Sequence, residues 1–215
     1  MILCSLGTAC SSLPQIVPAG DSTAAQISDK CHLAFPKGKW QFLHSLEATL
    51  PGGQKGFLMG LTVISSSDRS IRSIMMTLEG LVVFDAQLNG QTTVRRAIPP
   101  FDSADFASGL IQDIQLIFLE PLGPLIESGS LKNGSSACRH RQPGGWVVDI
   151  VIHPDDSWEI RKYRRDFHLM RTVKGMLEGK GDSSDGVGIP GRIELRAYGF
   201  PEYTLIMNLL AATPL

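Results

Sequence analysis

Apolar and polar residues alternate along much of the chain beyond Gly38, and this alternation predicts β-strands. In the segment 40–50, apolar Leu46, Ala48 and Leu50 alternate with polar residues. A period of two is expected of a strand with one buried face and one face in water. Turn sequences such as Asn89-Gly90 separate the segments. We predict about ten strands, at 40–50, 56–65, 70–78, 80–87, 92–98, 146–153, 157–164, 166–173, 192–198 and 202–210.

One stretch, 102–119, follows a helical period instead. Pro99 and Pro100 precede it and Pro121 ends it, while Asp102 and Asp105 supply negative charge at the expected N-terminus. Its apolar residues recur every three or four positions, so one face must be covered. Those residues include Phe106, Leu110 and Ile114. The order of elements predicts an α+β fold, in which a curved antiparallel sheet wraps over one principal helix.

The helix can meet the sheet in two ways, and the sequence leaves both open. It can complete a packed core, or it can close a cavity that holds an apolar ligand. Large, flexible apolar residues on the strands favour an adaptable lining. We assign to this apolar cavity Phe57, Met59, Met75, Phe84, Phe106, Leu110 and Ile114.

The first 35 residues differ from the rest. Lys30 is the first basic residue, and the segment is small, polar and interrupted by Pro and Gly. Gly7, Thr8 and Ala9 precede Cys10, which resembles the end of a bacterial lipoprotein signal peptide, where the cysteine carries the lipid (palmitate or a similar acyl group). We predict that 1–35 comprise this signal and a flexible tether, and that 36–215 form one domain. A disordered terminus is the alternative.

The chain has 4 cysteines. If Cys10 is lipidated, Cys4 is removed with the signal, and Cys31 and Cys138 remain as a pair in an oxidising compartment. We predict a disulfide between these two, with two reduced thiols as the alternative. No two cysteines have the spacing of metal ligands, so we expect no metal site.

Several function classes lack support. A formal net charge of -1 gives no electrostatic reason to expect nucleic acid. Motifs such as GxxxxGK, GxSxG and HExxH are absent from the sequence. The 5 histidines are scattered, and no set of nucleophile, base and oxyanion donors can be assembled. We therefore expect no enzyme activity, no catalytic residue and no cofactor, and we expect a monomer.

The pattern as a whole resembles the LolA/LolB-like outer-membrane lipoprotein carrier and receptor superfamily. The features in common are the cysteine and tether, a strand led by Trp40, the run TLEGLVVFDAQLNG, one inserted helix, and the later WVVDIVIHPDDSWEIRKYR. The likeness covers about 40–210 and implies an incomplete β-barrel with a helical lid. It also implies binding of acyl chains of lipoproteins or phospholipid, and a location in the bacterial cell envelope, anchored at the outer membrane through the N-terminal lipid and facing the periplasm.

Two other readings remain. Gly38, Lys39 and Trp40 spell the GxW that opens lipocalins, which are closed barrels that bind small molecules, although lipocalins carry their helix after the barrel. The chain also fits a structural envelope lipoprotein without a ligand.

Overall fold

The computed structural model describes residues 12–176, 189–199 and 201–215. Within them, thirteen strands form a single sheet with every neighbouring pair antiparallel. The strands are β1 (Val17–Pro18), β2 (Lys39–Thr49), β3 (Lys55–Ser65), β4 (Ile71–Met76), β5 (Val82–Asn89), β6 (Gln91–Ala97), β7 (Leu125–Ser130), β8 (Ser136–Arg141), β9 (Val147–Ile152), β10 (Trp158–Tyr163), β11 (Leu169–Met176), β12 (Arg192–Ala197) and β13 (Tyr203–Pro214).

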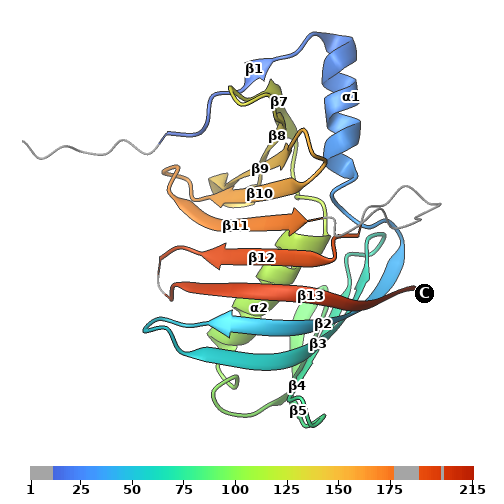
Figure 1. The fold of residues 1–215 in the computed structure, drawn as a ribbon, viewed down its shortest axis with the longest axis vertical. Helices are drawn as coiled ribbons and strands as arrows, with labels where there is room; N and C mark the ends of the chain where they lie inside the picture. Colours follow the sequence, from blue (N-terminus) through green and yellow to red (C-terminus); the bar gives the residue numbers. More distant parts are fainter. Residues whose placement is uncertain (1–11, 177–188, 200) are drawn as a thin grey trace, which may run out of the picture.

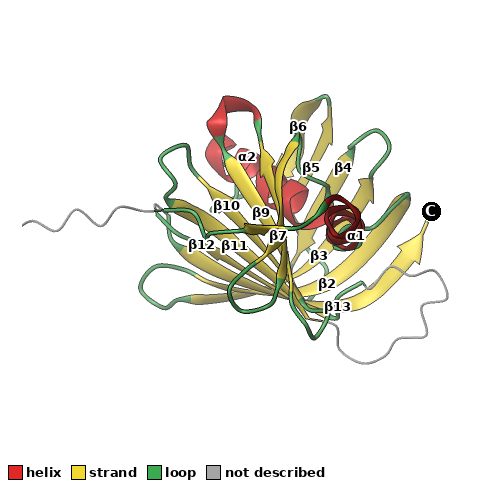
Figure 2. Cartoon of the chain, turned by 90° about the horizontal axis from the view of Figure 1, so that it is seen from above, coloured by secondary structure: helices red, strands yellow, loops and turns green. Residues whose placement is uncertain are grey.

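The sheet is open and strongly curved. Its order is β1-β7-β8-β9-β10-β11-β12-β13-β2-β3-β4-β5-β6, so the two edges are β1, labelled in Figure 1, and β6, labelled in Figure 2. Helix α2 (Ala104–Phe118) lies inside the curve, as the view from above shows (Figure 2). The prediction of one antiparallel sheet over a principal helix is confirmed. The lipocalin alternative requires a closed barrel, which an open order of strands does not provide.

The predicted number of strands was too low. All ten predicted strands are present, and the additional ones are β1, β7 and β8. Strands β7 and β8 read LIESGS and SACRHR, which carry no apolar alternation. The sequence of β8 does not show the alternation because the residue that is buried on its convex face is a charged one, Arg139, which is 5% exposed.

Helix α2 agrees closely with the predicted 102–119. Its N-cap is Ser103, whose Oγ accepts a hydrogen bond of 3.1 Å from the backbone N–H of Phe106. A hydroxyl acceptor at this position satisfies one of the free N–H groups of the first turn. The helix gives its apolar side to the concave face of the sheet, where Ile111, Ile114 and Ile117 are buried.

The N-terminal segment contains an unpredicted helix. Helix α1 (Asp21–His32) packs against β7, β8 and β9, so the prediction of a flexible tether over 1–35 is wrong for 12–35. Only Ile27 and Cys31 of this helix are buried, and its polar composition therefore resembles a linker. Tertiary contact holds the helix in place rather than a strong local pattern. Residues 1–11, with Cys4 and Cys10, lie outside the described residues.

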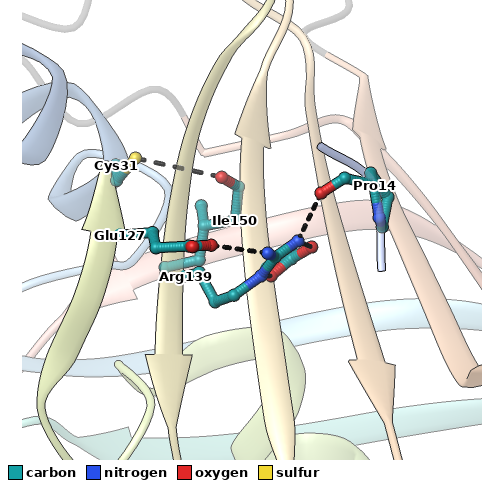
Figure 3. A network of polar contacts seen from close by, with 6 residues as sticks. Pro14, Cys31, Glu127, Arg139 and Ile150 are labelled. Atoms are coloured by element: carbon teal, nitrogen blue, oxygen red, sulfur yellow. Dashed lines mark hydrogen bonds and ion pairs between the residues drawn. The ribbon is translucent and has the colours of Figure 1, made fainter. Parts of the chain in front are cut away.

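A buried charge network fixes the chain just before α1 (Figure 3). Arg139 Nε and Nη2 donate to the two carboxylate oxygens of Asp149 at 2.7 and 2.8 Å, and Nη1 donates to Glu127 at 2.6 Å. The same Nη2 donates to the backbone oxygen of Pro14 at 2.8 Å. The bidentate pair and the carbonyl satisfy most of the guanidinium. The network thus clamps the segment around Pro14 to the convex face of β7–β9.

Candidate functional site

A buried polar cluster around Asp113 adds two hydrogen bonds to the apolar packing between helix α2 and the sheet. Asp113 Oδ1 accepts a hydrogen bond of 3.1 Å from Arg171 Nε on β11, and Asp113 Oδ2 accepts one from the hydroxyl of Tyr203 on β13. Burial raises the pKa of the Asp113 carboxyl, and the guanidinium of Arg171 offsets part of that rise. These two hydrogen bonds connect α2 to β11 and to β13.

A second polar group under α2 has no such partner. His44 on β2 is 1% exposed, and its ring centroid lies 6.0 Å from those of Phe42 and Phe118. Its Nδ1 has no hydrogen-bond partner among the residues that the structure describes. Burial lowers the pKa of His44 to about 4, so the ring is neutral at physiological pH.

Mild acid should weaken the fold through His44. Between pH 6.5 and about 4 the unfolded chain binds a proton on this histidine and the native state does not, so the free energy of unfolding falls as the pH falls. The loss is at most about 3 kcal/mol. We expect urea unfolding at pH 7 and pH 4.5 to show a smaller pH dependence for His44→Phe than for the native protein.

Asp113 and His140 also have shifted pKa values and therefore contribute to the pH dependence of both proteins. Asp113 has a raised pKa, so its native carboxyl binds a proton more readily and it works in the opposite sense. His140, with a pKa lowered mainly by burial, works in the same sense as His44. Both groups are present in the native protein and in the variant. An identical pH dependence of the two proteins would contradict the role given to His44.

The structure brings together only part of the predicted cavity lining. Met75 and Phe84 are buried in one cluster with the half-buried Phe106 and Leu110 of α2, and Phe84 meets Phe106 edge to face at 5.3 Å between centroids. Ile114 belongs to the neighbouring main core. These residues therefore contact one another.

Phe57 and Met59 were assigned to the wrong face. In the register of β3 with β2, Leu58 pairs with Leu46, which packs beside α2, so Phe57 and Met59 point to the convex side. Phe57 is 57% exposed. Because 57–65 is apolar at nearly every position, the sequence does not show whether the odd-numbered or the even-numbered residues face the helix.

A small void lies deeper under α2. It has a volume of about 10 Å³, enough for about one water molecule, and its walls include Phe42, Phe118 and Trp158. Trp158 Nε1 is buried, and no described residue forms a hydrogen bond with it. This part of the concave face is filled by side chains.

A larger opening lies beside α2, in a place that the sequence did not indicate. A groove of about 460 Å³ runs between the C-terminal half of α2 and the turn that joins β8 to β9. This volume is in the range of small-molecule sites. Its lining is Arg69, Gln112, Gln115, Leu116, Leu119, Glu120, Pro121, Leu122, Gln142, Pro143, Trp146 and Lys162.

The groove combines apolar and cationic groups. Leu116 and Leu119 are buried, whereas Leu122 is 49% exposed at the opening. Lys162 Nζ lies 4.9 Å from the centroid of the Trp146 ring, a cation–π contact. Burial lowers the pKa of Lys162, and Asp113 counteracts this. The arrangement suits an elongated molecule with one polar end.

A serine, histidine and glutamate lie near one another on the convex side. Ser135 Oγ is 3.0 Å from His153 Nδ1, and His153 Nε2 is 3.8 Å from Glu159 Oε2. Ser135 is 0% exposed, so its hydroxyl cannot meet a substrate. Glu159 also accepts a hydrogen bond of 2.7 Å from Arg161. This set is a structural network rather than a nucleophile with its base.

Cys31 and Cys138 are joined by a disulfide in the structure, with Cα atoms 6.4 Å apart. The bond ties the last turn of α1 to β8. Cys31 Sγ also lies 3.9 Å from the backbone oxygen of Ile150 (Figure 3), a contact without a hydrogen bond because an oxidised sulfur carries no hydrogen.

The described residues contain neither a candidate metal site nor a helix that could span a membrane. No group of three or more His, Cys, Asp or Glu side chains there is placed to hold a metal ion. Neither of the two described helices has the length and apolar character needed to cross a membrane.

Comparisons with known proteins identify the fold. A LolA-superfamily protein from Nitrosomonas europaea superposes with a TM-score of 0.55 at 10% identity, covering 89% of this chain and 93% of that chain. A domain assigned to outer membrane lipoprotein sorting, from Vibrio parahaemolyticus, superposes with a TM-score of 0.51 at 8% identity, covering 90% and 93%. By sequence, no family model and no curated protein matches. The chain has a LolA-like fold, which confirms the resemblance at that level.

Proposed function

We propose that this protein binds an acyl chain in the groove beside α2, as a carrier or receptor in lipoprotein or lipid transport to the outer membrane. The observation that supports this most is the groove of about 460 Å³ on the concave side of a LolA-like sheet. Leu116, Leu119 and Leu122 belong to the apolar part of the lining, and Leu122 is the one of the three with a large exposed surface for an acyl chain. The proposal includes a location in the bacterial envelope and a lipid anchor on Cys10.

The site of this proposal differs from the one expected from the sequence. Met75, Phe84, Phe106 and Leu110 pack against one another, so we place the ligand at the other end of α2. Trp146 lies in the wall of the groove, so we expect its fluorescence to change when a ligand binds there.

Native mass spectrometry of the protein purified from an envelope-containing host tests the proposal. We expect co-purified acyl species, and a mature chain that begins at an acylated Cys10. Leu122→Asp should reduce the bound species about tenfold or more, because a carboxylate at the opening opposes an apolar ligand. Leu50→Asp is the matched control, since Leu50 is 48% exposed in the turn between β2 and β3.

Two outcomes would contradict parts of the proposal. Equal loss of acyl species in Leu122→Asp and Leu50→Asp would show that the groove is not the site. Absence of any acyl species, with an unmodified Cys10, would favour the alternative of a structural protein without a ligand.

A further inference from the structure

Two cationic side chains lie side by side beneath α2, and both interact electrostatically with the same carboxylate, Asp113. Lys162 on β10 pairs in register with Arg171 on β11, and both face the helix. Asp113 is the carboxylate that acts on them, and its two oxygens are occupied by Arg171 and Tyr203. Within the part of the chain that the structure describes, the Lys162 ammonium has no hydrogen-bond or ion-pair partner. Asp113 acts on this half-buried ammonium only from a distance, without a hydrogen bond or ion pair between the two groups, so the position has no anion in direct contact.

The groove beside α2 has space for an anionic group next to Lys162. Lys162 and Trp146 form one part of its wall, and Arg69 contributes a second cation there. Arg69 uses only Nη1, which donates to the backbone oxygen of Glu120 at 3.0 Å, so its other N–H groups have no partner in the described residues. Glu120 is the carboxylate of this lining, and its Oε1 lies 3.0 Å from His32 Nδ1. Burial lowers the pKa of Arg69 and the charge of Glu120 offsets part of that fall, so Lys162 is the cation of the groove with the least compensation.

We propose that the ligand of this groove is an anionic amphiphile, whose carboxylate or phosphate oxygen pairs with Lys162 while its chain lies on Leu116, Leu119 and Leu122. This inference rests on the proposed function and adds the chemistry of the ligand's polar end. The rest of the lining agrees with it, since Gln115 and Gln142 carry amide donors near the opening. A neutral amphiphile would leave the ammonium without an anion, whereas a carboxylate makes a charge-assisted hydrogen bond.

Isothermal titration with three probes tests the inference: decanoate, decanol and inorganic phosphate, each below its aggregation limit and at low ionic strength. Decanoate should bind about tenfold or more tightly than decanol, and inorganic phosphate should bind far more weakly than decanoate. Lys162→Met should reduce decanoate affinity to that of decanol and change decanol affinity by less than about threefold. Lys162→Arg should keep the preference for decanoate.

Lys174→Met is the matched control. Lys174 lies on β11 at a convex, exposed position, so its loss should leave both affinities unchanged. The thermal unfolding midpoint of Lys162→Met should stay near that of the native protein, because an ammonium without a partner adds little stability. An unchanged preference of Lys162→Met for decanoate over decanol would overturn the inference.

The remaining outcomes separate this inference from the proposed function. Equal affinity of the native protein for decanol and decanoate would overturn the anionic head and leave acyl binding intact. Inorganic phosphate binding as tightly as decanoate would show an anion site that needs no chain, and would overturn the inference as well. If neither decanol nor decanoate binds, both proposals fail together.

Discussion

Replacing both bridged cysteines, Cys31→Ala with Cys138→Ala, should lower the free energy of unfolding by about 4 kcal/mol. The bond closes a loop with a sequence separation of 107 residues, and long loops lose the most conformational entropy when the unfolded chain is crosslinked. Both residues are buried, so no new polar group is exposed by the change to Ala. Urea unfolding of the oxidised native protein and the double variant measures the difference.

Reduction of the native protein serves as the comparison without a mutation. Its unfolding curve should approach that of the double variant, since Ala and a reduced thiol differ little in volume at these sites. Thiol titration of the purified native protein under denaturing conditions checks the premise. Two free thiols at these positions in protein from an oxidising compartment would reject the disulfide, and equal stability of the oxidised and reduced proteins would reject its energetic role.

Phe84→Ala should cost about 3 to 5 kcal/mol of stability if the packed arrangement of α2 is correct. Phe84 is 0% exposed and contacts Phe106 of α2, so truncation leaves a hole between the sheet and the helix. A cavity designed to hold an acyl chain at this place would tolerate the enlargement at a much lower cost. Chemical denaturation at pH 7 therefore distinguishes a core from a ligand site.

Phe57→Ala is the matched control, because the same type of side chain is removed from β3 at a 57% exposed position. It should change stability by less than about 0.5 kcal/mol. A similar cost for the two variants would mean that the convex side near Phe57 is covered in solution. A small cost for Phe84→Ala alone would move the ligand site back to the residues first expected from the sequence.

The strands and the main helix were predictable because their patterns are local. Residues 40–50 and 102–119 each carry a period that one face in water and one face in the core impose. Strands β7 and β8 have no such pattern, since Arg139 is buried by pairing with Asp149 rather than by apolar packing. Helix α1 was missed for a related reason: it buries only Ile27 and Cys31, and the disulfide and the packing on β7–β9 hold it in place.

The candidate site was less predictable because it is assembled from distant segments. Arg69 comes from the turn after β3, Leu116 from α2, Trp146 from the residue just before β9 and Lys162 from β10. None of these positions has a motif, and their proximity depends on the curvature of the whole sheet. The assignment of Phe57 failed in the same way, since only the register of β3 with β2 shows which side it faces.

The place of β13 in the sheet has a consequence for how the protein is made. It pairs with β12 on one side and with β2 on the other, along residues from Thr204 opposite Thr49 to Pro214 opposite Trp40. Of the thirteen strands, β13 leaves the ribosome last, so during translation β2 and β12 both present unpaired backbone edges. The first half of the sheet therefore waits for a partner more than 150 positions away in sequence. A nascent chain of this kind needs protection from aggregation until its final strand is available.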